Sequence, residues 1–374
     1  MRRVRSLRVR TLVGALVLAG LAWVAASRRE STARAKPHRH EARDPAPHAR
    51  APRKPIPPDS PWASREACER ALAAGGAPRA AGVARIGAWN LHWFPDGRPG
   101  DGRPEGAADL AWLACGIAWL KVDVLAVEEI KRPPRGDEGL AELTRRLDAL
   151  TGGSWQSLLD DCPHASSQHV GLLFDAKRVK LRSHAVVGAL NPLGEPCKNE
   201  LRPGLAGYFA FPGGLDLSVV AAHLKSGVDE RAFTDRARSF DAFAEAAAAE
   251  QRRTRDRDVL FIGDMNTMGC EDCDVPVAPV AELARIDAAF ASSHASLARL
   301  GAEPACSHRY AGHSVLLDWA AKSDLAELPS GSHVTVSGAC GELGCDALGE
   351  HLAPEQHLSD HCPIWVDLDD VDRD

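Results

Sequence analysis

Polar side chains that could hold a cation or move a proton follow several apolar segments of the sequence. In segment 259–267, four apolar residues run into Gly263, Asp264 and Asn266. Such a run, closed by a Gly-Asp turn, predicts a buried strand with polar groups at its end. Asp264 and Asn266 are two residues apart, so an extended chain projects both to one side, where they could hold a metal-bound phosphate. For this segment alone, ordinary turn chemistry is the alternative.

The same pattern recurs at the ends of other predicted strands. The polar residues found there are Asn90, Glu129, His223, Asp264, Asn266, Asp318, Asp360 and His361. Carboxylate and amide oxygens are the ligands of hard divalent cations, and histidine titrates near neutral pH, which suits proton transfer. Each residue alone is more typical of a turn, a solvated strand end or a structural histidine. Together they predict a metal-assisted catalytic site.

The elements that must position these residues alternate between strand and helix. We predict helices at 64–74, 107–120, 139–150, 232–249 and 279–300, and strands at 83–89, 122–127, 154–159, 170–174, 179–187, 207–211, 215–222, 259–262, 314–321, 333–337 and 363–368. Strands 170–174 and 179–187 are expected to pair across a turn at 175–177, and 207–222 to form a hairpin. Without a Gly-rich phosphate loop, this order predicts an α/β fold: a two-sheet α/β sandwich with helices on the outside.

The N-terminal part of the chain has a different composition. Arginines precede an apolar stretch that ends at Val24, Ala25 and Ala26, so residues 1–27 are predicted to be a signal peptide or an uncleaved N-terminal anchor. Residues 28–60, rich in Arg, Pro and His, are predicted to be a disordered linker. A short helical lead-in at 61–82 would precede the domain at 83–369. The domain is therefore expected to be secreted or periplasmic, with membrane contact only if the segment is uncleaved.

Charge limits how a substrate could be held. The chain has a formal net charge of −6, and its first 60 residues are basic while the remainder is acidic. An acidic body argues against binding a polyanion through a broad basic surface. A phosphate would be held locally by a metal and a few cations, for which Arg202 and Lys225 are candidates. Ordinary surface positions are the alternative for both.

The cysteines indicate the redox environment. Ten cysteines in an apparently exported chain predict disulfides. The spacing of Cys270, Cys273, Cys340 and Cys345 leaves a four-thiolate zinc site as the alternative.

The order and spacing of the motifs resemble the endonuclease/exonuclease/phosphatase superfamily of DNase I-like phosphodiesterases. The matching segments are 86–90, 126–130, 219–226, 263–266, 317–319 and 359–363. Three departures stand out: Glu128 where the family usually has Gln, Trp319 after Asp318, where it could reshape the floor of the site, and the lack of an identifiable carboxylate partner for His223. Glu128 is expected to add a negative charge beside Glu129.

This resemblance implies roles for the residues. Glu129, supported by Asn90 and Asp360, would hold Mg²⁺ or Mn²⁺, with Ca²⁺ as a further option, and a second metal could bind near Asp264 and Asn266. His361, oriented by Asp318, would act as general base or stabilise the charged phosphorane. His223 would donate a hydrogen bond or a proton to the phosphate, and Asn266 would position the phosphate.

The resemblance also implies hydrolysis by an activated water without a covalent enzyme intermediate. The leading hypothesis is an exported metal-dependent nuclease with DNA, or RNA, as its nucleic acid substrate and no stable protein partner. The alternatives are a phospholipid or inositol phosphate hydrolase of the same superfamily and a catalytically silent binding subunit with the same fold.

Overall fold

The computed structural model describes residues 55–97, 107–131, 134–162, 168–193, 201–293, 296–310, 313–345 and 352–373. The predicted signal peptide or anchor and most of the predicted linker lie outside these residues. Contacts divide the chain after residue 52, and every described residue belongs to the second unit. None of the described helices has both the length and the apolar character needed to cross a membrane.

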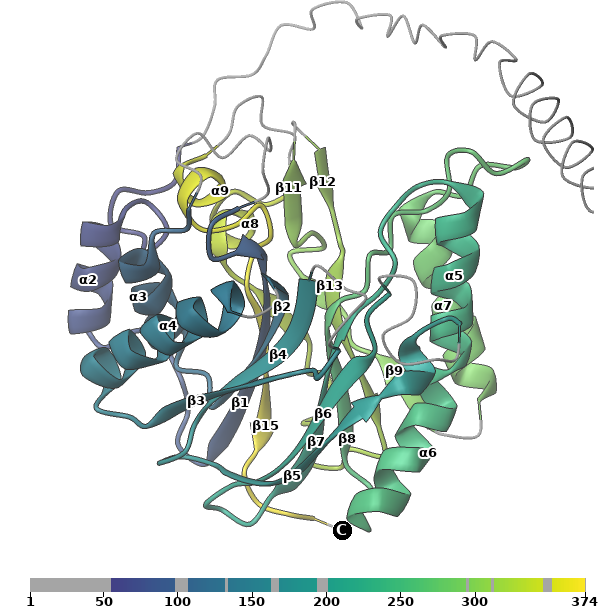
Figure 1. Cartoon of the computed structure of the whole chain (residues 1–374), viewed down its shortest axis with the longest axis horizontal. Helices are drawn as coiled ribbons and strands as arrows, with labels where there is room; N and C mark the ends of the chain where they lie inside the picture. Colours follow the sequence, from purple (N-terminus) through teal and green to yellow (C-terminus); the bar gives the residue numbers. More distant parts are fainter. Residues whose placement is uncertain are drawn as a thin grey trace, which may run out of the picture. The chain divides into compact units, whose positions relative to one another are not determined.

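Two mixed β-sheets face each other in this unit (Figure 1). The first has seven strands in the order β10-β14-β15-β1-β2-β4-β3: Ala302–Glu303, Val334–Val336, Ile364–Asp369, Val83–Phe94, Val124–Lys131, Gln168–Asp175 and Trp155–Leu159. The second has six in the order β5-β6-β7-β8-β13-β9: Lys180–Val187, Gly204–Ala210, Asp216–His223, Val259–Asp264, Asp318–Ser323 and Leu297–Arg299. A small ribbon pairs β11 (His308–Tyr310) with β12 (His313–Val315).

Helices cover the outer faces of both sheets (Figure 1). The first sheet is covered by α2 (Arg65–Ala73), α3 (Leu110–Leu120) and α4 (Arg135–Thr151), and the second by α5 (Glu230–Asp241), α6 (Phe243–Thr254) and α7 (Pro279–Ser292). Short elements η1 (Gly188–Leu190), α8 (Gly338–Leu343) and α9 (Ala353–His357) complete the set. This arrangement confirms the predicted α/β sandwich with helices outside.

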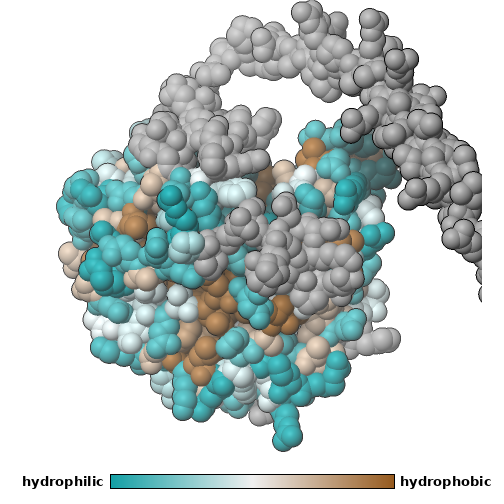
Figure 2. Space-filling model, in the orientation of Figure 1, coloured by the Kyte–Doolittle hydropathy of each residue, from teal (hydrophilic) through white to brown (hydrophobic). Residues whose placement is uncertain are grey.

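Apolar side chains fill three layers. The central layer, between the sheets, includes Ile86, Leu172, Leu217, Ile262 and Ile364, which are all at most 1% exposed. The other two layers lie between each sheet and its helices. Because the central strands are covered on both faces, they read as nearly continuous apolar runs. Figure 2 shows hydrophobic atoms of this face gathered between the two sheets, while the flanking helices present mainly hydrophilic atoms.

Four predictions about local structure are wrong. The helix predicted at 279–300 ends at Ser292, and strand β9 follows it. The strand predicted at 314–321 is divided between β12 and β13, and Leu316 and Leu317 belong to neither.

Strands β4 and β5 do not pair with each other: β4 pairs with β2 and β3, and β5 pairs with β6 in the other sheet. A turn signal shows where a strand ends but not which sheet receives the next one. The single helix predicted at 232–249 is two helices that meet at Ala242. Phe240 and Phe243 lie on either side of this break and still both face the second sheet, because their rings pack on Trp319 and Phe261 respectively.

Four disulfides join described cysteines: Cys68–Cys115, Cys270–Cys273, Cys306–Cys345 and Cys340–Cys362. None of the cysteines in the described ranges is free. The four cysteines considered for zinc are divided among three separate disulfides, so the tetrathiolate alternative is not supported. Cys197 lies outside the described residues.

The Cys340–Cys362 disulfide should contribute measurably to stability. It closes a separation of 22 residues, for which chain-entropy loss in the unfolded state predicts about 3 kcal/mol. We expect the double variant Cys340→Ser, Cys362→Ser to lower the free energy of unfolding by that amount in urea titration. The Cys270–Cys273 disulfide closes a separation of only 3 residues. The matched double variant Cys270→Ser, Cys273→Ser should therefore lose less free energy of unfolding. An equal or larger loss in the second pair would contradict the entropic account.

A carboxylate pair on the second sheet should make stability depend on pH. The Tyr208 hydroxyl lies 2.6 Å from Asp216 Oδ2 and 3.0 Å from Asp256 Oδ2. Burial, opposed by hydrogen bonds from Asp258 and Tyr208, raises the pKa of Asp256 to about 6. A carboxyl with a raised folded-state pKa stabilises the protein fully below its unfolded pKa of about 3.9, and this contribution is lost as pH rises through about 6.

Replacing Asp256 with Asn should remove this dependence. Asp256 is partly exposed, so solvent screening reduces the expected gain at pH 8 to about 1 kcal/mol. The difference from the wild type should vanish near pH 4. Urea titrations at pH 4, 6 and 8 measure it, and a gain that is constant across this range would show that the titration of Asp256 is not its cause.

Candidate active site

Three of the predicted site residues form one row across the second sheet. His223 ends β7, Asp264 ends β8 and Asp318 begins β13, and the strand registers pair His223 with Asp264 and Asp264 with Asp318. All three are at most 3% exposed. His223 Nε2 lies 3.4 Å from Asp264 Oδ2. The row exists because β7 and β8 run parallel and end together, while β13 starts antiparallel at the same edge.

The first sheet contributes residues from the facing side. Asn90, which is fully buried in β1, donates from Nδ2 to Asp264 Oδ2 at 2.9 Å and so links the two sheets. Next to it, β2 bulges against β4 between Val127 and Ile130, and its pairing with β1 is interrupted between Glu128 and Ile130. Glu129 lies in this bulge with a left-handed φ of 60°. Bulges of this kind re-aim side chains beside functional sites, and here Glu129 Oε2 accepts a hydrogen bond from Trp93 N at 3.1 Å.

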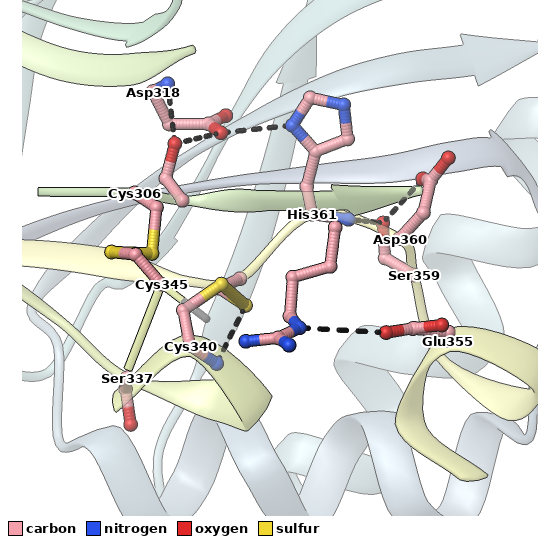
Figure 3. The surroundings of a disulfide bond; sticks show 12 residues. Cys306, Asp318, Ser337, Cys340, Cys345, Glu355, Ser359, Asp360 and His361 are labelled. Atoms are coloured by element: carbon pink, nitrogen blue, oxygen red, sulfur yellow. Dashed lines mark hydrogen bonds and ion pairs between the residues drawn. A yellow bond between two sulfur atoms is a disulfide. The ribbon is translucent and has the colours of Figure 1, made fainter. Parts of the chain in front are cut away.

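The loop before β15 brings in Asp360 and His361. Ser359 Oγ donates to the carbonyl of Asn90 at 2.7 Å and accepts from His361 N at 3.0 Å, which fixes the loop against β1. His361 Nδ1 then lies 2.8 Å from Asp318 Oδ2, and its Nε2 lies 3.8 Å from Asp264 Oδ2. Figure 3 shows the His361 ring turned towards Asp318, with the Cys306–Cys345 disulfide nearby.

The crowded acids and histidines shift each other's pKa. Burial alone would lower the pKa of His361, but Asp318, Asp264 and Asp360 raise it well above its usual value. Burial raises the pKa of Asp264 to about 6. Asp318 and Glu129 add to this increase, while His361 and the hydrogen bond from Asn90 oppose it. Strongly perturbed titratable groups that gather in one place are typical of functional sites.

The pKa of His223 is shifted in the opposite direction from that of His361. Burial, with the charges of Arg202, His361 and Lys225, lowers its pKa well below the usual value, so its ring is neutral at neutral pH. Its Nδ1 is buried and has no hydrogen-bond partner within the described residues. The charges of Arg202 and Lys225 act on His223, while their contact with a phosphate stays a prediction. Arg202 also donates to Gln168 Oε1 at 3.0 Å, and Lys225 Nζ donates to Ser226 O at 2.6 Å.

Glu128 lies in a buried environment that disfavours its charged form. It is fully buried, and neither carboxylate oxygen has a hydrogen-bond partner among the described residues. Burial, together with Asp318 and Asp264, raises its pKa well above the usual value. This environment favours the protonated form of Glu128 over the negative charge expected from the sequence. A protonated carboxyl group is close in shape and hydrogen-bonding capacity to Gln, the residue more usual at this position in the family that the sequence resembles.

Asn266 and Trp319 also differ from expectation. β8 ends at Asp264, and Asn266 has a left-handed φ of 52°, so the two side chains do not project together from an extended chain. Instead, Asn266 N donates to Asp264 Oδ1 at 3.0 Å, and Asn266 Nδ2 donates to Leu224 O at 3.1 Å. Trp319 does not form the floor of the site. It packs in the layer between the second sheet and its helices, because neighbouring strand residues point to opposite faces.

Sequence reasoning missed three residues of this region. Ser307 Oγ donates to Asp318 Oδ2 at 2.7 Å and accepts from Asp318 N at 2.7 Å. His92 Nδ1 lies 2.8 Å from Asp360 Oδ1, and His308 Nε2 lies 3.6 Å from Asp360 Oδ2. The position of His92, two residues after Asn90, could have been noticed. Ser307 and His308 had no signal, because β11 is too short to stand out in the sequence.

The donor set fits a divalent cation. Carboxylates and the Asn90 amide supply oxygen ligands of the kind that Mg²⁺ and Mn²⁺ take. Asp318 Oδ1 is buried without a hydrogen-bond partner within the described ranges, and burial, together with repulsion from Asp318 and Glu129, raises the pKa of Asp264. A bound cation would relieve this repulsion.

Comparison with known proteins shows which fold this is. No protein-family model and no curated protein matches the sequence significantly. Among solved structures, an endonuclease/exonuclease/phosphatase from Beutenbergia cavernae is similar at 18% identity and a TM-score of 0.51, over 77% of this chain and 71% of that chain. A second one, from Bacteroides vulgatus, is similar at 11% identity and a TM-score of 0.50, over 76% of this chain and 98% of that chain.

The chain has the DNase I-like fold of the endonuclease/exonuclease/phosphatase proteins. A humanized D. rerio TDP2 is also similar, at 17% identity and a TM-score of 0.49, over 77% of this chain and 99% of that chain. The two matches with TM-scores of 0.50 and 0.51 confirm the predicted fold class.

Proposed function

We propose that this protein is an exported, divalent-metal-dependent phosphodiesterase that hydrolyses nucleic acid, with DNA as the leading substrate. One observation carries the proposal. Asn90, His223, Asp264, Asp318 and His361 come from both sheets and meet as one buried, hydrogen-bonded polar cluster. Burying so many polar and charged groups costs free energy even when they are paired, so a cluster of this kind is typical of a functional site.

The metal would be held by oxygen ligands at the mouth of this cluster. We assign Glu129 as the main ligand, with support from Asn90 and Asp360 and a second position near Asp264 and Asn266. Mg²⁺, Mn²⁺ or Ca²⁺ fits these ligands. When bound, the cation would polarise the phosphate and lower the pKa of a bound water.

His361 and Asp318 would act as one unit. Asp318 Oδ2 accepts the His361 Nδ1 proton at 2.8 Å, which directs Nε2 towards Asp264 and the reacting phosphate. Because the Asp318, Asp264 and Asp360 carboxylates raise its pKa against the effect of burial, His361 carries a proton at neutral pH in the metal-free protein. This favours stabilisation of the charged phosphorane by donation from Nε2 over action as a general base.

The remaining residues would hold the phosphate. His223, neutral because of burial, can donate one N–H to a phosphoryl oxygen. Asn266 would position the same group, and Arg202 and Lys225 would supply positive charge from the side of His223. Local cations of this kind suit an acidic protein, which has no broad basic surface for a polyanion.

The described surface favours a polar substrate over a lipid. Its exposed large hydrophobic side chains are only Leu150, Val275, Val280 and Val371. Hydrolysis of a membrane lipid would call for a contiguous apolar patch, and four scattered residues do not form one. Inositol phosphates stay an alternative substrate that the site chemistry would accept.

Backbone geometry argues against a catalytically silent binding subunit. Four non-glycine residues near the site have left-handed backbones: His92, Trp93, Glu129 and Asn266, with φ values of 49°, 55°, 60° and 52°. Each such conformation costs about 1–3 kcal/mol and tends to be kept where function needs it. A scaffold used only for binding would have no need of them.

Conversion of supercoiled plasmid by the purified full-length protein tests the proposal. We expect nicking with Mg²⁺ or Mn²⁺ and none with EDTA, together with hydrolysis of bis(4-nitrophenyl) phosphate. Parallel incubations with RNA, phospholipid vesicles and inositol phosphates separate the substrate classes. Hydrolysis of lipid or inositol phosphate without cleavage of nucleic acid would replace the proposed substrate, and no hydrolysis of any phosphoester would favour the binding subunit.

The four described disulfides support export, because such bonds persist in oxidising compartments. The N-terminal sequence of the protein recovered from culture fluid or periplasm tests it. We expect a new terminus close to residue 27, and recovery of the intact chain from the membrane fraction would favour the anchor.

A further inference from the structure

Two histidines that the proposed hydrolysis does not use, His92 and His308, lie against Asp360 of the proposed site. His308 Nε2 lies 3.6 Å from Asp360 Oδ2. The rings of His308 and His361 are adjacent, with centroids 4.5 Å apart. One potential ligand atom from each of His308, Asp360 and His361 lies within 4.8 Å of the other two.

Two imidazoles and one carboxylate form a ligand set with a known preference. Protein sites of this composition keep open positions and bind zinc, iron or related first-row ions. Metal–ligand bonds of about 2.0–2.2 Å place neighbouring ligand atoms roughly 2.9–3.4 Å apart. The separation of 3.6 Å between His308 and Asp360 therefore requires only a small closure around an ion.

Hydrogen-bonded neighbours already orient two of these ligands. His361 Nδ1 is held by Asp318 Oδ2 at 2.8 Å, which leaves Nε2 as the ligating nitrogen. His92 Nδ1 holds Asp360 Oδ1 at 2.8 Å, on the oxygen that His308 does not approach. Metal-binding histidines typically have a carboxylate on their second nitrogen, and metal-binding carboxylates are themselves hydrogen-bonded.

The backbone around the cluster fits a built site that solvent can reach. His92 and Trp93 are consecutive left-handed residues, at φ values of 49° and 55°, and this strained turn directs His92 to Asp360. The side chains of His308 and Asp360 are each 16% exposed. An ion can therefore enter from solvent without opening the fold.

We propose that His308, Asp360 and the Nε2 atom of His361 form a site for a first-row transition metal ion such as Zn²⁺, with His92 and Asp318 as positioning residues. The site shares Asp360 with the Mg²⁺ position proposed at Glu129, but its two imidazole ligands differ from the oxygen ligands there. Because His361 has one remaining nitrogen, an ion at this site withdraws His361 from contact with phosphate. Such an ion would compete with the hydrolysis proposed above.

Calorimetric titration of the metal-free full-length protein with Zn²⁺, in excess Mg²⁺, tests the site. The N-terminal His38, His40 and His48 could bind zinc themselves, so all variants carry Gln at these positions. We expect one Zn²⁺ per chain. His92→Gln should weaken binding by about 10- to 100-fold, as for an outer-shell partner, and His308→Gln should weaken it more.

His333→Gln is the matched control. His333 Nε2 also lies 3.6 Å from a carboxylate, that of Glu303, but outside this cluster, so its affinity for Zn²⁺ should stay within twofold of the wild type. Unchanged affinity in a folded His308→Gln variant would overturn the proposal. X-ray absorption of the Co²⁺ form of the parent protein gives a second measurement if that variant does not fold. Two imidazole nitrogens around Co²⁺ are expected, and a shell of oxygen alone would refute the site, whatever the outcome of the plasmid assay.

Discussion

Glu129→Gln is expected to lower kcat/KM for a phosphodiester by at least about a hundredfold, because a catalytic cation contributes several kcal/mol to transition-state stabilisation. The fold should be intact: Glu129 is only partly buried, and its contact with Trp93 N at 3.1 Å can be made equally well by the Gln carbonyl. Steady-state kinetics over a range of Mg²⁺ and Mn²⁺ concentrations, with circular dichroism as the folding check, measure the effect.

The control for this change is Glu138→Gln, the same chemical replacement at an exposed position of α4. Its activity should equal that of the wild type. Wild-type turnover by Glu129→Gln at saturating metal would contradict the assignment of Glu129 as the main metal ligand.

His361→Ala should lower kcat/KM by about 10²- to 10⁴-fold, the range typical of a group that transfers a proton or stabilises charge in the transition state. Asp318 accepts the Nδ1 proton of His361 at 2.8 Å and, under our proposal, acts only through this ring. Asp318→Asn should therefore add little to the loss already caused by His361→Ala, because residues that act as a unit are not additive.

A double-mutant cycle on one diester substrate separates this pairing from independent roles. His223 and His361 both lie near Asp264 Oδ2, but under our proposal His223 donates to the phosphate without the help of Asp318. Combining His223→Ala with His361→Ala therefore gives the comparison in which losses are expected to come closer to multiplying. Multiplicative losses for Asp318 and His361 would mean that Asp318 acts on the reaction by another route, such as direct metal binding.

The fold was predictable because strand ends and catalytic motifs coincide in this chain. The apolar runs before His223 and Asp264 identify β7 and β8, and their parallel register then places both side chains at one edge. The sequence did not predict which sheet each strand joins or where a helix is broken. The chain passes from the first sheet to the second between β4 and β5, and this depends on packing that no local turn signal contains. The break between α5 and α6 is hidden in the sequence because the two helices share one apolar stripe across their junction.

The site was predictable where residues lie in compact motifs and not where tertiary contacts assemble it. Asp360 and His361 are adjacent in sequence, and their motif pointed to them directly. His308 reaches them only because β11 bridges back to His361. The environment of Glu128 could not be predicted for a related reason: its pKa is raised by burial and by Asp318 and Asp264, which are distant in sequence.

The central claim is that the buried polar cluster is a phosphodiesterase centre. A crystal structure of the full-length protein with Mn²⁺ and a phosphorothioate DNA strand tests it most directly, because anomalous scattering locates the manganese ion. The account predicts a manganese peak at the Glu129 carboxylate, near Asn90 and Asp360, with a phosphate within hydrogen-bond distance of both His223 and His361. No peak at Glu129, or a phosphate bound out of reach of both histidines, would contradict the assignment of this buried cluster as a phosphodiesterase centre.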